Sequence, residues 1–251
     1  MPLILLFFLP MAAVQASTIT VAIDHAPPYS FTHGPEAKGL LLDILTPIAD
    51  ELGLELKVVP CPFSRCVHML EQSEVDIMGG LIRTKQREQE LTFVTPAYMA
   101  LHSSFRFYSL RDSGMEITGY EDLYGKRIAV MRGAAHFARF DKDLDLIKVP
   151  VTSEQVALQM LLKGRVDLFI GVEETAEHAM SILRQPVYQL VKQPYQYRDS
   201  IFGYMAYSRD FAKTPLANKI TSRYQEIAEQ GQLTELVKPY ALPPIQGHSS
   251  Q

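Results

Sequence analysis

Basic residues are too few and too scattered in this chain to form a nucleic-acid-binding surface. The 251 residues include 24 Lys and Arg against 28 Asp and Glu, a formal net charge of −4, and no run of Lys and Arg is dense enough to create a basic patch. Cysteine is also scarce. The two cysteines, with His68 nearby, do not complete a tetrahedral metal site, and the other histidines lack metal-ligand spacing. We therefore expect no nucleic-acid partner, no metal and no other cofactor.

The chain begins with an apolar run, MPLILLFFLPMAAVQA, that is too short and too interrupted by proline to span a bilayer. It ends in AVQA, where Val14 and Ala16 have the spacing of the two small residues of a signal-peptide cleavage site. No Lys or Arg precedes the apolar core, and a membrane anchor or a buried helix is the alternative. We interpret residues 1–16 as a signal peptide cleaved after Ala16. Because Ser17 and not Cys would follow the cut, we expect no membrane anchor and a periplasmic location.

If the protein is exported, the two cysteines of PCPFSRCVHML can form a disulfide. In an oxidising compartment, Cys61 in a loop and Cys66 early in a helix can reach disulfide distance. Two buried thiols are the alternative. We expect the disulfide to form and to stiffen its corner of the protein. It should add little global stability, because the loop that it closes is short.

Strands and helices are expected to alternate along the first half of the chain. The hydrophobic content of 47% is enough for one large core or for two lobes of about 100 residues each. The patterns predict strands at 18–23, 54–60 and 75–80, and helices at 39–53 and 63–72. A Pro-rich loop, DHAPPYSF, follows the first strand. Pro47 either kinks the first helix or begins a second one capped by Thr46.

A second alternating series follows. The patterns predict strands at 125–133, 147–151 and 166–171, helices at 152–164, 173–183, 210–231 and 232–241, and extended crossover segments at 101–109 and 200–208. Thr152 and Gln155 have the spacing of a capping box. We expect an α/β protein whose two lobes each contain a mixed sheet flanked by helices, joined by two crossover strands. Lobe 1 comprises residues 17–105 and 201–251, and lobe 2 residues 106–200.

Six segments in this order resemble a known family. They are APPYSF, GLLLDILTPIADELGLELKVV, EVDIMGGLIRTKQREQELTFVTPAY, EDLYGKRIAVMRG, LLKGRVDLFIGVEE and FGYMAYSRDFAKTPLANKITSRYQEIAEQGQLTELVKPYA. On these segments the chain is identified as a member of the extracellular solute-binding proteins, family 3, the receptors of polar amino-acid ABC transporters. The resemblance implies a two-lobed type II periplasmic-binding-protein fold that closes on its ligand by a hinge motion.

The resemblance also implies a ligand-gripping arginine in GGLIRTKQR. In family members an Arg three residues after a Thr holds the ligand carboxylate, and Arg87 follows Thr84 at this spacing. If Thr84 caps a helix, the side chain of Arg87 leans back toward the cleft at Gly80, where free backbone N–H groups favour an anion. The planar guanidinium suits a carboxylate. A surface ion pair of Arg87 with Glu88 or Glu90 is the alternative.

Several positions depart from the family pattern. Ile82 stands where many members offer a hydroxyl, so only its backbone can contribute, and Ala134 follows Gly133 where members carry Thr or Ser. The family aspartate that binds an α-ammonium would fall at Val172. Glu173 is adjacent and could substitute for it, because a buried ammonium needs a partner.

Other candidate ligand contacts lie in the expected cleft. Asp24 ends the first strand and either holds a polar group of the ligand or caps its loop. Tyr29 walls the pocket or packs in the core. Arg65 and Arg132 could add positive potential near the cleft, although lone arginines are commonly solvated. His25, in the same loop as Asp24, is a weaker candidate.

These features favour a receptor over an enzyme. We expect a monomer that captures a small carboxylate-bearing, amino-acid-like solute and presents the closed form to an ABC transporter permease. One alternative is a periplasmic dehydratase on the same fold, in which Glu173 donates a proton while Arg87 holds a carboxylate. The other is a stand-alone sensor module. Fused sensors of this fold continue into a membrane helix, and the sequence has no such helix at its end, which lowers that alternative.

Overall fold

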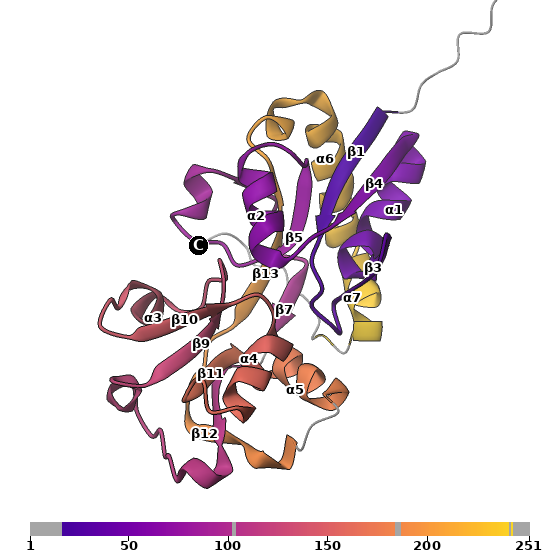
Figure 1. The fold of residues 1–251 in the computed structure, drawn as a ribbon. Coiled ribbons are helices and arrows are strands. Elements are labelled where there is room, and N and C mark those ends of the chain that lie inside the picture. The colour runs from indigo at the N-terminus through magenta and orange to yellow at the C-terminus, as the bar shows by residue number, and fades with distance from the viewer. Residues whose placement is uncertain (1–16, 102–103, 184–186, 241, 243–251) are drawn as a thin grey trace, which may run out of the picture.

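A computed structural model describes residues 17–101, 104–183, 187–240 and 242 of the chain. Two sheets divide these residues into two lobes, one above the other in Figure 1. The predicted signal peptide, the tail from Pro243 and residues 102–103 of the first expected crossover lie outside the described residues. Within the described ranges, no helix has both the length and the apolar character needed to cross a membrane.

The first lobe is built on a mixed sheet with the strand order β4-β1-β5-β13-β6, and β7 also pairs with β13. The strands are β1 (Ser17–Ile23), β4 (Leu54–Pro60), β5 (Ile77–Leu81), β6 (Thr92–Phe93), β7 (Met99–Leu101) and β13 (Ile201–Tyr207). β1 pairs in parallel with β4 and β5, whereas β13 is antiparallel to its neighbours. The strand–helix–strand pattern therefore predicted the parallel part of this sheet correctly.

Helices pack against this sheet through the apolar faces that their sequences predict. They are α1 (Leu40–Leu52), α2 (Phe63–Glu71), α6 (Pro215–Glu229) and α7 (Gln232–Val237), with short 3-10 turns η1 (Arg87–Gln89), η5 (Phe211–Lys213) and η6 (Lys238–Tyr240). In α1 the buried stripe contains Leu41, Ile44, Leu45 and Ile48. Pro47 lies inside α1, so one helix continues through the proline and no second helix begins at Thr46.

The second lobe has a mixed sheet with the order β10-β9-β11-β8-β12. Its elements are β8 (Phe105–Leu110), η2 (Arg111–Ser113), η3 (Tyr120–Leu123), β9 (Arg127–Met131), α3 (Ala138–Lys142), β10 (Ile147–Val151), α4 (Glu154–Leu162), β11 (Leu168–Val172), α5 (Glu173–Ile182), η4 (Val187–Gln189) and β12 (Leu190–Tyr197). The expected capping box was wrong by one position. Ser153, not Thr152, caps α4, and its Oγ accepts a hydrogen bond of 3.2 Å from the N–H of Val156.

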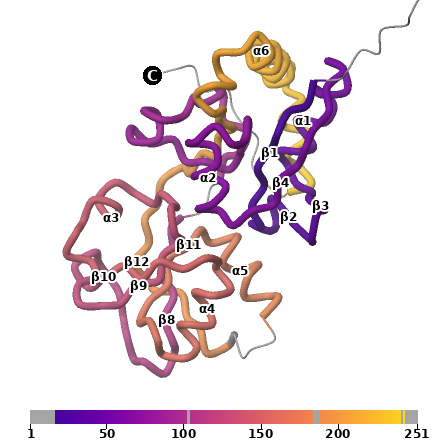
Figure 2. Tube along the Cα trace, turned by 45° about the horizontal axis from the view of Figure 1, so that its top comes forward, coloured from indigo at the N-terminus to yellow at the C-terminus, as the bar shows by residue number. Residues whose placement is uncertain are grey.

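A hairpin that the sequence did not predict follows β1. It consists of β2 (Ser30–His33) and β3 (Glu36–Gly39), where only a Pro-rich loop was expected. Gly39 ends the hairpin with φ +148°, and a Cβ at this position would collide with the carbonyl of Tyr29. In the trace of Figure 2, as in Figure 1, α5 of the second lobe lies below this hairpin. The hairpin thus brings residues of the first lobe to the boundary between the lobes.

The strands of the two sheets show where the chain crosses between the lobes. β13 belongs to the first sheet and β12 to the second, so the chain returns to the first lobe between Tyr197 and Ile201. Phe105, expected to end the first segment of lobe 1, instead begins β8 and pairs with Val172 and Tyr197 in the second sheet. Its side chain is buried there.

The disulfide expected at the corner of the first lobe is present. Cys61 lies directly after β4, Cys66 lies in α2, and the two are bonded. Cys66 is fully buried against the sheet beside Ala22 and Met78. The bond therefore ties the end of β4 to the first turn of α2.

Replacing both cysteines by serine should lower the free energy of unfolding by about 2 kcal/mol or less, because the disulfide closes a short loop in the unfolded chain. Denaturant unfolding of the oxidised protein with and without a reductant gives the comparison. The reduced wild type and the double variant should unfold at similar midpoints. A loss above about 4 kcal/mol would contradict a purely local role.

Candidate ligand-binding site between the lobes

A cavity of about 190 Å³ lies between the two lobes and is lined by both of them. The first lobe contributes the loop after β1, the β2–β3 hairpin and the ends of β5 and β7, and the second contributes the ends of β9 and β11 and the starts of α4 and α5. Most of the lining side chains are apolar or aromatic, and the larger of them are Ile23, Tyr29, Leu41, Phe63, Ile82, Tyr98, Met99, Leu101, Met131, Val172 and Ile201. An apolar chamber with a few polar groups is typical of a small-molecule site.

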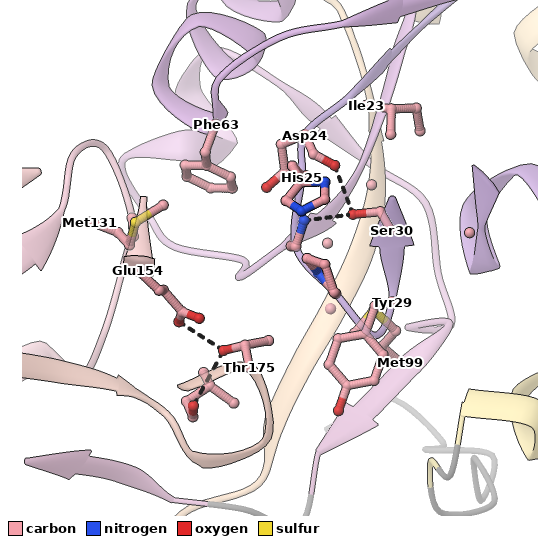
Figure 3. Close-up of a pocket in the computed structure, with 18 of the residues that line it drawn as sticks. Ile23, Asp24, His25, Tyr29, Ser30, Phe63, Met99, Met131, Glu154 and Thr175 are labelled. Carbon is pink, nitrogen blue, oxygen red and sulfur yellow. Dashed lines mark hydrogen bonds between the residues drawn. The ribbon is translucent and has the colours of Figure 1, made fainter. Parts of the chain in front are cut away.

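Asp24 supplies the first of two carboxylates in this cavity (Figure 3). It follows β1, and its carbonyl oxygen accepts a hydrogen bond of 2.8 Å from Ser30 Oγ, which holds the loop to the hairpin. Burial raises the pKa of Asp24 to about 6, and the hydrogen bond from its own backbone N–H opposes this rise only in part. Among the described residues, no Lys, Arg or hydroxyl group pairs with the carboxylate.

Glu154 supplies the second carboxylate, and it comes from the other lobe. It is the first residue of α4, and Figure 3 shows its side chain reaching toward Thr175, whose Oγ1 donates to Glu154 Oε1 at 2.8 Å. Burial raises the pKa of Glu154 to about 7, the hydrogen bond from Thr175 opposes the rise, and the charge of Asp24 adds to it. A helix N-terminus ordinarily favours a carboxylate, so burial is the stronger effect here.

Glu154 is not among the residues predicted from the sequence to line the cleft. The residue directly follows the Ser153 cap, within a stretch that was interpreted only as a capping box. One signal could have identified it. It begins the helix that follows β10, and the carboxyl ends of parallel strands meet at the edge of a sheet where ligands bind.

Two imidazoles line the cavity, and a third acid, Glu174, acts on one of its tyrosines. His25 and His178 line the cavity from opposite lobes, and the ring of Phe31 lies between them, 6.3 Å from one and 6.1 Å from the other. Burial and the nearby His178 lower the pKa of His25. Glu174 Oε2 is buried and has no hydrogen-bond partner among the described residues. Burial, reinforced by the charge of Glu174, raises the pKa of Tyr29.

The guanidinium of Arg87 does not lie where the sequence analysis placed it. Thr84 Oγ1 accepts from the Arg87 N–H at 3.2 Å, as expected of a cap, but only the single 3-10 turn η1 follows. Arg87 is 8% exposed and is absent from the cavity lining. Its Nη1 donates to the Ile82 carbonyl and its Nη2 to the Gly133 carbonyl, both at 2.8 Å. The second bond joins the two lobes.

The remaining candidates fall into two groups. Gly80, Ile82, Asp24, Tyr29 and Ala134 all line the cavity. Arg65 and Arg132 do not: both are exposed, and Arg65 forms an ion pair of 3.1 Å with Glu74. Arg65 and Arg132 were predicted as ligand contacts from their charge alone. Charge does not specify in which direction a surface side chain points.

Glu173 also lies outside the cavity lining, while its neighbour Val172 is part of it. The Glu173 carboxylate accepts hydrogen bonds from Arg106 Nε at 2.9 Å and Lys192 Nζ at 2.6 Å. Burial alone would raise the pKa of Glu173, but these two hydrogen bonds outweigh it and lower the pKa below its ordinary value. A carboxylate held ionised by two cations is a poor proton donor, so the geometry gives the dehydratase alternative no acid at this position.

No Lys or Arg belongs to the described lining of the cavity. The basic residues of GGLIRTKQR lie elsewhere: Arg83 and Lys85 line a second cavity of about 460 Å³, which shares Ile82 and Ile201 with the first. Arg83 is also paired with Glu88. Nor does any described group of three or more His, Cys, Asp or Glu side chains have the arrangement of a metal site.

Residues 19–243 match the family model of the bacterial extracellular solute-binding proteins, family 3. The chain belongs to this family. Among its relatives, a putative ABC transporter arginine-binding protein 2 of Escherichia coli K12 is 27% identical over 166 residues, which are 64% of this chain and 65% of that protein. The virulence sensor protein BvgS of Bordetella pertussis is 30% identical over 175 residues. That alignment spans 68% of this chain and 14% of the sensor protein.

Solved structures agree with the fold of this family 3 protein. Holo ArgBP from T. maritima superposes with a TM-score of 0.70 at 23% identity, covering 90% of this chain and 96% of that one. A histidine kinase sensor domain with similarity to periplasmic binding proteins has a TM-score of 0.74 at 18% identity, covering 92% and 99%. The two-lobed type II periplasmic-binding-protein fold expected from the sequence is therefore confirmed.

Neutralising Glu154 should stabilise this solute-binding protein at alkaline pH. The folded state keeps a proton on Glu154 up to about pH 7, well above the ordinary value of 4.5. The unfolded chain loses that proton earlier, so the contribution of Glu154 to stability is present below about pH 4.5 and is lost as the pH rises through about 7. Glu154→Gln should therefore raise the free energy of unfolding by roughly 1–3 kcal/mol at pH 8.

Thermal unfolding of wild type and variant at pH 8 and pH 4 measures this effect. The difference in melting temperature should shrink at the lower pH, where both forms are neutral at position 154. Glu229→Gln, an exposed glutamate on α6, is the matched control and should show no such pH dependence. Destabilisation of Glu154→Gln at pH 8 would mean that the carboxylate is stabilised in the unliganded protein.

Proposed function

We propose that this protein is a periplasmic receptor that encloses a small, amino-acid-like solute between its lobes. The observation that supports this is the cavity itself, because it is assembled from strand ends and helix starts of both lobes. A ligand held there contacts both halves of the protein at once. Such a ligand binds the closed arrangement more tightly than an open one and so shifts the population toward closure.

We propose that an ABC transporter recognises the closed form of the protein. Membership of the family and the relative in Escherichia coli named as a putative arginine-binding protein of an ABC transporter support this partner. A sensory role is the second candidate, supported by the similarity to BvgS and to a histidine kinase sensor domain. In both roles the event that matters is the same closure on a solute. We do not propose the dehydratase alternative, because Glu173, the acid on which it depended, is held by two cations.

We assign Arg87 to lobe closure. Its guanidinium donates one hydrogen bond to the carbonyl of Ile82 in its own lobe and another to the carbonyl of Gly133 in the opposite lobe. These two bonds use two of its five N–H donors and hold the guanidinium outside the described lining of the cavity, where a ligand carboxylate was expected to meet it.

A thermal-shift screen of the purified protein tests the receptor function. Amino acids, their amine derivatives, dipeptides and organic acids should include at least one compound that raises the melting temperature in a saturable way. Occupancy at about 100 times the dissociation constant adds about 2.7 kcal/mol to the unfolding free energy. If no compound from these classes stabilises the protein, the proposed receptor function fails.

Arg87→Ala should weaken binding of the compound identified in that screen by about tenfold, because the closed form loses a charge-assisted hydrogen bond between the lobes. Isothermal titration calorimetry measures the change. Arg223→Ala, which removes an arginine paired with Glu51 on the outer side of the first lobe, is the control and should bind normally. Unchanged affinity of Arg87→Ala would show that the bond to Gly133 contributes nothing to closure.

A further inference from the structure

We propose that the solute is anchored by an organic cation, an ammonium or guanidinium group on an apolar body, held between Asp24 and Glu154, and that a carboxylate on the solute is dispensable. This inference rests on the proposed receptor function and specifies its ligand. It replaces the anion expected from the sequence with a cation.

The cavity has the charge of a cation site. Its described ionisable lining side chains are two carboxylates, two imidazoles and two tyrosine hydroxyls, and the described lining includes no Lys or Arg. Glu174, with a buried carboxylate oxygen that lacks a hydrogen-bond partner among the described residues, adds negative potential beside Tyr29. Two acids brought together by the closing lobes repel each other, and a cation between them removes that repulsion.

Both acids have acceptor capacity left for a ligand. Apart from its own backbone N–H, Asp24 has no hydrogen-bond donor to its carboxylate among the described residues. Glu154 uses Oε1 for Thr175, and no described residue donates to Oε2. An ammonium or guanidinium offers several N–H donors, and charge-assisted hydrogen bonds to carboxylates are among the strongest available in a buried site.

The walls around the acids fit the apolar part of such a ligand. Figure 3 shows Phe63 beside Asp24 and Met131 beside Glu154, with Met99 and Tyr29 on the opposite side. These side chains offer apolar surface and aromatic rings, and an aromatic face also attracts a cation. The site therefore suits an alkyl chain that ends in a basic group.

The described lining of this cavity includes no Lys or Arg that could pair with a carboxylate on the ligand. Arg87 is not among the described lining residues, and it donates to the carbonyl oxygens of Ile82, which lines the cavity, and of Gly133, which does not. Arg83 and Lys85 line the second cavity. A free carboxylate buried near Asp24 and Glu154 would add a third negative charge without a cation to balance it. Removing the carboxylate from a basic amino acid should therefore preserve binding or improve it.

Matched pairs of compounds test this directly. Arginine and agmatine differ only in the carboxylate, as do lysine and cadaverine, so isothermal titration calorimetry at pH 8 isolates its contribution. We expect agmatine or cadaverine to bind at least as tightly as its amino-acid counterpart. Tenfold or tighter binding of both amino acids over their amines would overturn the inference.

Variants of the two acids complete the test. Asp24→Asn and Glu154→Gln keep the shape of each side chain and remove its charge, and each should weaken amine binding at least tenfold. Circular dichroism and thermal unfolding confirm that each variant is folded, and Glu229→Gln is the control that should bind normally. Amine affinity unchanged in both folded variants would also overturn the inference.

The outcomes separate this inference from the receptor function on which it rests. If amino acids, dipeptides or organic acids bind and none of the amines does, the receptor function stands and the cation anchor is wrong. If no compound of any class stabilises the protein, the receptor function itself fails and the cation anchor falls with it.

Discussion

The site depends on one geometric constraint: the carboxyl ends of the parallel strands of both sheets face each other across the boundary between the lobes. Asp24 follows β1, Ile82 follows β5, Ala134 follows β9 and Glu154 follows β10, while Val172 ends β11. Side chains that leave a parallel sheet at this edge meet in one place. Two such edges, brought together, enclose a cavity that neither lobe contains alone.

Burial and the groups that each acid contacts together set its pKa. Glu173 and Glu154 are the same residue type, and both are the first residue of a helix in the second lobe. Glu173 meets Arg106 and Lys192 and has a lowered pKa, whereas Glu154 meets a hydroxyl group and another carboxylate and has a raised pKa. The partners across space, more than the position in the helix, set the charge of each group. Asp24 and Glu154, which have no cation partner among the described residues, line the cavity, and the ion-paired Glu173 does not.

Much of the fold could be predicted from local patterns. Hydrophobic periodicity located the main strands and helices, and the spacing of the two cysteines indicated the disulfide that the structure contains. Among the positions near strand ends, Asp24, Gly80 and Ala134 line the cavity, because the end of a strand fixes where the next residues lie. The β2–β3 hairpin was missed, because prolines and a glycine in that segment indicate a loop as readily as a hairpin.

The sequence by itself determined the order of the elements, the two-lobed architecture that this order implies, and the glycines and acids available at the strand ends. Only the tertiary structure decided which charged groups meet. The Arg87 guanidinium bonds a carbonyl 46 residues away in the other lobe, and Asp24 and Glu154 reach the same cavity from opposite lobes. Such pairings depend on how the two lobes approach each other, and no local pattern of residues encodes that approach. Arg87, which was predicted to clamp an anion, therefore bonds the opposite lobe in this structure. The cavity beside it is lined by the carboxylates of Asp24 and Glu154.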